Sequence, residues 1–297
     1  MSKYKITVFT ATYNREHTLS RLYYSLQRQT FREFEWVIVD DGSTDNTEEL
    51  INNFKSDKIN SFTIKYIKQE RGGKHRAINT GLDIAEGELF FLVDSDDYIT
   101  ENALEKIVFW EKSINNKSEY SGLCGLSGYD KNTSIGTTFK GDYKDMRVTE
   151  QFSSSITGDR ANIFYTSIFR KYKYPTFEGE WHIAPGVPYI RMATDGYKMR
   201  YFNDIIYIAE YLEDGLTKMG DRKISENFNG YTLRSKELLL TEIPLKRKLE
   251  VIGKYSYLGK KKGLKYNKIA KNLNTNIIVT YLLGRLAEVY FLLRNSK

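Results

Sequence analysis

The sequence predicts an α/β protein in which a mostly parallel central sheet is flanked by helices and followed by a helical C-terminal extension. Three observations predict this fold. Strand-like and helix-like segments alternate over the first hundred residues, which is the pattern of βαβ units. Clusters of acidic residues directly follow two of the expected strands. From residue 221 onward the pattern is helical, with few residues that would break a helix.

The alternating segments predict eight elements before residue 114. The expected strands are residues 6–10, 34–39, 62–67 and 88–93, and the expected helices are residues 17–29, 44–54, 73–85 and 101–113. The first helix is predicted from apolar residues at helical spacing, and Ser43 or Thr44 is the expected cap of the second. Residues 120–211 are less regular, with a hairpin expected at Gly141 and Asp142.

Composition excludes several classes of protein. The 297 residues are 40% hydrophobic and 28% charged, which is typical of a globular chain. The single cysteine, Cys124, excludes a disulfide framework within the chain and fits a reducing compartment. With only three histidines beside it, a structural zinc site is not expected. The apolar stretch at residues 6–9 is too short for a signal peptide, and the sequence predicts no membrane-spanning helix.

The charge is distributed unevenly along the chain. Residues 221–297 carry 17 basic and 6 acidic residues, a balance of +11, whereas residues 1–220 carry 28 and 32, a balance of −4. Such asymmetry indicates an anionic partner for the basic region, either a membrane surface or nucleic acid.

Two acidic clusters follow predicted strands. Asp40 and Asp41 follow the second strand, and Asp94-Ser95-Asp96-Asp97 follows the fourth. Ligands of open parallel sheets bind beyond the carboxyl ends of the strands. Two carboxylates spaced two residues apart at a strand end point to one side and repel each other, unless a cation lies between them. Mg²⁺ and Mn²⁺ prefer such oxygen ligands and often bridge them to phosphates.

Four ordered motifs carry a family resemblance. They are Thr12-Tyr13-Asn14-Arg15, Val39-Asp40-Asp41-Gly42-Ser43-Thr44-Asp45, Gly72-Gly73-Lys74 and Leu92-Val93-Asp94-Ser95-Asp96-Asp97. Together they resemble the family 2 glycosyltransferases of the GT-A fold, of the type that builds bacterial surface polysaccharides. A weaker resemblance extends to about Leu216 through two further motifs, residues 177–180 and 210–217.

The resemblance implies a nucleotide-diphosphate-sugar donor, expected to be a UDP-sugar, a Mn²⁺ or Mg²⁺ cofactor, and inversion at the anomeric carbon. Asp41 would bind the nucleobase, and Tyr13 would line the base pocket together with the backbone near Thr12. Arg15 belongs to the same donor-binding motif. Asp96 would ligate the metal that bridges the two phosphates. Asp94 would contact the ribose or complete the metal site, and Asp97 is expected to cap a neighbouring helix.

Basic residues near the expected start of the third helix are candidate phosphate ligands. Gly73, Lys74 and Arg76 lie where free backbone N–H groups would add further donors. A cation at the departing diphosphate stabilises charge that develops mainly in the transition state, which is the interaction that catalysis requires.

Inversion also needs a base for the acceptor hydroxyl. Related sequences often carry Glu at the start of a helix that this chain would begin near residues 186–189, but here Ala184-Pro185-Gly186 stand there. Glu180 is the first candidate for the base, followed by Glu178 and His182. The alternative is that these carboxylates lie in solvent. Asp159 would pair with Arg160 or shape the acceptor pocket.

The predicted organisation is a glycosyltransferase domain at residues 1–220 and a basic helical region at residues 221–297. Residues 1–117 would form the nucleotide-sugar-binding half of the domain, and residues 118–220 the acceptor-side half. The acceptor is expected to be a glycan or a lipid-linked glycan. The basic region would either pack on the sheet, contact another subunit or lie on a membrane surface, and nucleic acid is not an expected partner. The expected location is the cytoplasm, and the alternative is a peripheral position on the inner face of the cell membrane.

Two other functions remain open from the sequence. A non-catalytic sugar-nucleotide-binding or scaffold protein would explain the missing acid near Pro185. A nucleotidyltransferase would also use a metal and an acidic pair, but residues 10–15 lack the glycine-rich basic loop expected after its first strand.

Overall fold

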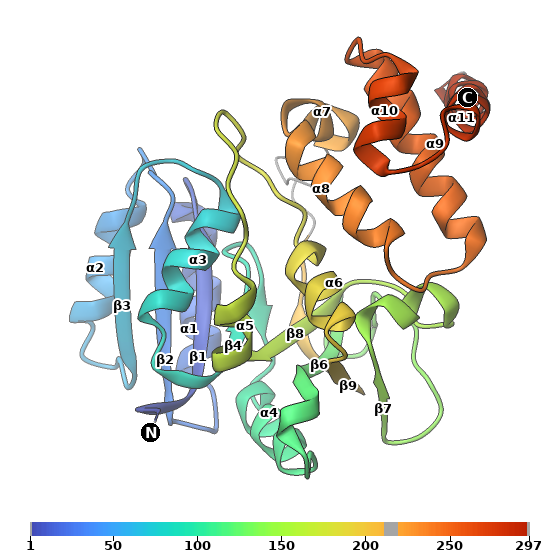
Figure 1. The fold of residues 1–297 in the computed structure, drawn as a ribbon. Coiled ribbons are helices and arrows are strands. Elements are labelled where there is room, and N and C mark those ends of the chain that lie inside the picture. The colour runs from blue at the N-terminus through green and yellow to red at the C-terminus, as the bar shows by residue number, and fades with distance from the viewer. Residues whose placement is uncertain (1, 211–218, 296–297) are drawn as a thin grey trace.

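The computed structural model describes residues 2–210 and 219–295 (Figure 1). The strands in this part of the chain are β1 (Tyr4–Thr12), β2 (Phe34–Asp40), β3 (Thr63–Lys68), β4 (Gly87–Leu92), β5 (Tyr98–Ile99), β6 (Tyr120–Gly128), β7 (Tyr143–Met146), β8 (Arg160–Tyr165) and β9 (Lys198–Ile208). The α-helices are α1 (Glu16–Gln27), α2 (Thr47–Ser56), α3 (Lys74–Ile84), α4 (Ala103–Lys112), α5 (Thr166–Phe169), α6 (Gly186–Thr194), α7 (Gly220–Glu226), α8 (Phe228–Leu239), α9 (Leu245–Lys261), α10 (Tyr266–Leu273) and α11 (Ile277–Asn295). Short 3-10 helices are η1 (Lys117–Glu119), η2 (Val148–Ser153) and η3 (Arg170–Tyr172).

All these strands belong to one sheet. Its path runs β3-β2-β1-β4-β8-β6-β9-β5, and β7 joins it by pairing with β9. The first four strands pair in parallel, because a helix crosses over between each of them and the next. β8 then runs antiparallel to both β4 and β6. The predicted α/β fold with a helical C-terminal region is confirmed, with parallel pairing in β1–β4 and again between β6 and β9.

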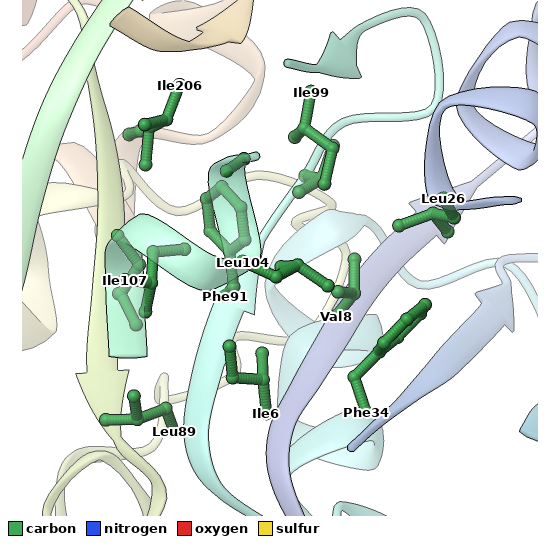
Figure 2. Close-up of a cluster of buried hydrophobic side chains, with 14 of the residues drawn as sticks. Ile6, Val8, Leu26, Phe34, Leu89, Phe91, Ile99, Leu104, Ile107 and Ile206 are labelled. Carbon is green, nitrogen blue, oxygen red and sulfur yellow. The ribbon is translucent and has the colours of Figure 1, made fainter. Parts of the chain in front are cut away.

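Alternation along the strands builds a core on each face of the sheet. Ile6 and Val8 of β1 join a cluster with Leu26 of α1 and Leu104 of α4 (Figure 2). Phe9, the residue after Val8, points to the opposite face and packs in a second cluster with the apolar side of α3. The sheet is therefore covered on both faces, so a ligand can reach it only at the ends of the strands.

The eight elements predicted before residue 114 are present, with bounds that differ by a few residues, and the short strand β5 was not predicted. α6 begins at Gly186, within the predicted range of residues 186–189. Two local expectations are wrong. The second helix begins at Thr47, and the Ser43 hydroxyl accepts a hydrogen bond from the Asn14 N–H (2.8 Å) rather than capping that helix. The segment after Gly141 is β7, which pairs with β9 and not with the residues before the turn.

The C-terminal helices α7–α11 gather at the end of the molecule away from β3 (Figure 1). Tyr255 of α9 is fully buried in a cluster that includes Ile269 of α10. α9 and α11 approach closely at two glycines, since a Cβ on Gly253 would lie 3.2 Å from the Leu283 carbonyl oxygen and one on Gly284 2.9 Å from the Ser256 Cβ. In the described part of the chain no single helix has the length and apolarity to cross a membrane. Only α10 and α11 together meet that test of length and composition, and they are bent by 107°.

The predicted domain boundaries stay predictions. The sheet continues across residue 117, so the two predicted halves share one core, and α7 begins at Gly220. Residues 211–217 of the weaker motif lie outside the described residues.

Candidate active site

An acidic cluster follows β4. The carboxylates of Asp94, Asp96 and Asp97 offer oxygen atoms that all lie within 4.8 Å of one another. Burial and the charge of Asp94 raise the pKa of Asp96. Three carboxylates at such a spacing repel each other, and a cation between them would relieve that repulsion. The oxygen-only donor set fits Mg²⁺ or Mn²⁺.

Asp97 has a further structural role in this cluster. It caps no helix, because α4 begins only at Ala103. Its carboxylate instead accepts hydrogen bonds from the Tyr207 hydroxyl (2.5 Å) and the Glu210 N–H (2.7 Å). Burial and the charge of Asp94 raise the pKa of Asp97 to about 7. Asp97 thus ties the end of β4 to the end of β9, which corrects the capping expectation.

Lys74 supplies the positive charge closest to Asp94. It is the first residue of α3, and its Nζ lies 2.5 Å from Asp94 Oδ1. Burial acts to lower the pKa of Lys74, but the charge and hydrogen bond of Asp94 outweigh burial and raise it. Arg76 lies elsewhere, because its guanidinium donates to the Phe177 carbonyl (3.3 Å) and it does not line the cleft described below. Of the two predicted basic phosphate ligands, the fold brings Lys74 to the acidic cluster and turns Arg76 away.

Asp41 holds the turn that precedes α3. Its Oδ2 accepts the Gly73 N–H (2.7 Å), and its Oδ1 accepts the Gly72 N–H (2.9 Å) and the Gln69 side-chain amide (2.8 Å). Gly73 has φ 93° and ψ 156°, a conformation that is almost restricted to glycine. The contact of Asp41 with a nucleobase stays a prediction. The hydrogen bonds that the Asp41 carboxylate accepts fix the loop that leads into α3.

The end of β1, which lies between β2 and β4 in the sheet, lines the same crevice. Thr12 is buried, and Tyr13 lies under the guanidinium of Arg71, 4.1 Å from the ring centroid. Arg15 is close enough to Asp96 for its charge to counteract the rise in the pKa of that carboxyl. The nearby Asn14 accepts a hydrogen bond from the Thr44 N–H (2.8 Å), so the loops after β1 and β2 are tied together. The sequence analysis missed Arg71, although it directly precedes the Gly72-Gly73 pair.

The two carboxylates predicted to act as the base do not reach this crevice. Glu178 is exposed, and Glu180 is only 8% exposed. Glu180 accepts the N–H groups of Asn229 (2.6 Å) and Gly230 (2.8 Å) at the start of α8, where a carboxylate is stabilised by the helix dipole. Neither Glu178 nor Glu180 lines the cleft. Their catalytic roles stay predictions, and the bonds of Glu180 dock its loop onto the helical region.

These parts surround one continuous cleft of about 2470 Å³. Its walls combine the strand-end residues, the segment around Asp159 and Arg160, and residues from α7, α8, α9 and α11. His75 and His182 also face it, and burial lowers the pKa of each to about 4, so both are neutral near pH 7. The cleft therefore joins an acidic cluster, the start of a helix and a wall supplied by the C-terminal region.

Comparison with known sequences identifies the strand-end half of the cleft. The family described as Glycosyl transferase family 2 matches residues 7–116, which contain the acidic cluster, Asp41, Gly73 and Lys74. Residues 7–116 match a family 2 glycosyltransferase domain. Every predicted donor-binding residue lies in this glycosyltransferase domain, whereas Glu178 and Glu180 lie outside it.

Curated relatives share mainly the glycosyltransferase domain. The chain is 28% identical over 174 residues to the Campylobacter jejuni GalNAc(5)-diNAcBac-PP-undecaprenol beta-1,3-glucosyltransferase, which covers 57% of this chain and 54% of that protein. It is 39% identical over 103 residues to the poly(ribitol-phosphate) beta-N-acetylglucosaminyltransferase TarS of Staphylococcus aureus, covering 34% of this chain and 18% of the relative. The chain thus spans at most about half the length of these two relatives.

Solved structures resemble the fold over a longer stretch. TarS residues 1–349 in complex with UDP superpose with a TM-score of 0.58 at 20% identity, over 86% of this chain and 72% of that one. A Pyrobaculum calidifontis mannosyltransferase in complex with GDP-Man and Mn²⁺ gives a TM-score of 0.54 at 17% identity, over 96% and 75%. At this identity the likeness shows that the glycosyltransferase domain and the segments after it share a GT-A arrangement.

Proposed function

We propose that this chain is an inverting, metal-assisted glycosyltransferase that moves a sugar from a UDP-sugar to a hydroxyl of a glycan or lipid-linked glycan. The observation that carries the proposal is the Asp94–Asp96–Asp97 cluster beside Lys74 and the start of α3, at the carboxyl ends of the strands. The glycosyltransferase domain supports the reaction class. The UDP and Mn²⁺ complexes of the structural neighbours support the donor and the cofactor.

Asp94 and Asp96 would hold Mn²⁺ or Mg²⁺, whose charge would stabilise the diphosphate as the sugar–phosphate bond breaks. Lys74 adds a second positive charge at the same edge, and the first N–H groups of α3 point outward from the helix toward an anion. Tyr13, with Arg71 over its ring, offers a flat wall for a nucleobase. Asp41 accepts the Gly73 N–H and so helps to hold the turn that leads into α3.

Inversion requires the acceptor oxygen to attack the anomeric carbon from the face opposite the diphosphate, while a base removes its proton. Glu180 is bonded to α8 on both oxygens, so we assign it a positioning role for its loop. Asp159 is an exposed carboxylate that lines the cleft just before β8. We propose Asp159 as the base, ahead of Glu180 and Glu178.

Release of UDP from a panel of UDP-sugars tests the reaction. With Mn²⁺ and a surface-glycan acceptor extract, the full chain is expected to release UDP from one donor of the panel, and Asp159→Asn to slow that release about 100-fold or more. The matched Glu180→Gln variant is expected to lose thermal stability more than turnover. UDP binding without turnover of any donor would favour the non-catalytic sugar-nucleotide-binding alternative, which the placement of Glu178 and Glu180 outside the cleft supports.

The acceptor class is supported by relatives named for undecaprenol-diphosphate-linked and poly(ribitol-phosphate) substrates. We also propose peripheral contact with a membrane through α11. Large apolar side chains of this helix are exposed along most of its length: Ile277, Ile278, Val279, Tyr281, Leu282, Leu286, Val289, Tyr290, Leu292 and Leu293. The preceding helices carry lysines that would favour an anionic leaflet.

Co-sedimentation with vesicles that contain anionic phospholipid tests the contact of α11 with a membrane. Ile278→Glu is expected to reduce the bound fraction several-fold, because it places a charge on the apolar face. Ile59→Glu is a matched control, since Ile59 is 63% exposed and Ile278 64%. Equal vesicle binding by the two variants would contradict the proposal.

A further inference from the structure

The C-terminal helices contribute a cationic wall to the cleft. Arg234 of α8 and Arg247 of α9 both line it, far along the chain from the acidic cluster. Arg234 is half-buried, and among residues 2–210 and 219–295 no hydrogen-bond acceptor or carboxylate lies within bonding distance of its guanidinium. A charge withdrawn from water normally has a partner, because desolvation is costly.

Arg247 increases the positive charge at this wall. One end of its guanidinium donates to Glu250 (2.9 Å), and the group lies 5.2 Å from the Phe152 ring centroid. Its Nε is buried and has no hydrogen-bond partner in the part of the chain that the structure describes. Burial, together with the charge of Arg247, lowers the pKa of Arg234. Two arginines that repel each other, and whose donors are not all used among the described residues, would be stabilised by an anion placed beside them.

The surface beyond this pair is apolar. Leu249 of α9, with Leu286 and Tyr290 of α11, lines the same cleft and is exposed to solvent. The walls of the cleft therefore combine the carboxylates at the strand ends, the two arginines and apolar residues of α9 and α11. A ligand that fills it would carry a hydroxyl-bearing group, then an anionic group, and could continue as an apolar chain.

We propose that Arg234 and Arg247 bind a phosphate or diphosphate group of the acceptor, at a second anion site separate from the donor site of Asp94, Asp96 and Lys74. The inference rests on the proposed function, because it names the acceptor's chemistry. The same group could come from a lipid-linked diphosphate or from a phosphate-bearing polymer. The apolar residues beside the arginines matter only for the lipid source.

Calorimetric titration of the full chain in metal-free buffer tests this second site. The probes are inorganic pyrophosphate, farnesyl diphosphate below its micelle concentration, and farnesol. Both diphosphates are expected to bind to the wild type. Arg234→Gln and Arg247→Gln are each expected to weaken the affinity for both diphosphates about tenfold or more, since each substitution removes a charge-assisted contact. Arg234→Lys should retain part of the affinity. Arg285→Gln, an exposed arginine of α11 that does not line the cleft, is the matched control and should bind as the wild type does.

Two comparisons separate this site from the donor site. Diphosphate binding is expected to persist in Asp96→Asn, and the affinity for UDP with Mn²⁺ to be unchanged in Arg234→Gln. Tighter binding of farnesyl diphosphate than of pyrophosphate would support the lipid source, and equal binding the polymer source. The inference is overturned if neither diphosphate binds, if Arg234→Gln binds both as the wild type does, or if farnesol binds as tightly as farnesyl diphosphate. If only UDP binding fails, the donor site is overturned, and diphosphate binding still tests the second site at Arg234 and Arg247.

Discussion

Replacing Gly73 by alanine is expected to disrupt the turn before α3 and to weaken UDP binding about tenfold or more. A Cβ at this position would lie 1.7 Å from the Trp181 carbonyl oxygen, so either the turn or the 177–183 segment must move. The backbone also has φ 93°, which L-residues rarely adopt. Strain and overpacking each cost about 1–3 kcal/mol, so the free energy of unfolding should fall by about 2–5 kcal/mol.

Gly196→Ala is the matched control for Gly73→Ala. Gly196 also has φ 93°, but nothing lies within 4 Å of the position its Cβ would take. Its substitution should cost about 1–2 kcal/mol and leave UDP binding unchanged. Thermal unfolding and UDP titration of the two variants separate the cost of the positive φ from the cost of the clash. Equal losses in both variants would contradict the close approach of Trp181 to the turn.

Replacing Asp96 by asparagine is expected to reduce sugar transfer by about 100-fold or more. Asn keeps the size of the side chain and removes the negative charge that would hold the metal against the diphosphate. The variant should remain folded, because burial and the charge of Asp94, which raise the pKa of Asp96, act against its negative charge and a neutral side chain avoids both. Initial rates measured over a range of Mn²⁺ concentrations distinguish lost metal affinity from lost turnover.

The control for the Asp96 variant is Asp204→Asn, which alters an exposed carboxylate paired with Lys106 (2.7 Å). That substitution should leave the transfer rate within about twofold of the wild type. Full activity of Asp96→Asn, or dependence on Mn²⁺ identical to that of the wild type, would remove Asp96 from the metal site.

The parallel half of the fold and the acidic cluster could be predicted because their signals are local. The β-rich run of β1 and the helical spacing in α1 are set by neighbouring residues. The acidic run Asp94–Asp97 comes directly after a buried strand, so its place at the sheet edge follows from chain order alone.

The partners of individual polar side chains could not be predicted in the same way. Asp41 bonds to Gly72 and Gly73, about thirty residues later, and Asp97 bonds to Tyr207 from β9. Glu180 caps α8, a helix that begins almost fifty residues after it. These contacts depend on how segments far apart in the sequence pack together in the fold, which spacing along the chain does not encode. The bond of Glu180 to α8 is such a contact, and nothing in the local sequence indicates it.

Calorimetric titration of UDP into the full chain, with Mn²⁺ and again with a chelator, tests the central claim most directly. The claim is that the ends of β1, β2 and β4 form a metal-assisted site for a nucleotide-diphosphate donor. UDP binding with Mn²⁺ is expected to weaken about tenfold or more when the metal is removed, with a comparable loss in Asp96→Asn. A folded wild-type protein that does not bind UDP with Mn²⁺, or binds it equally without metal and in Asp96→Asn, would contradict the account.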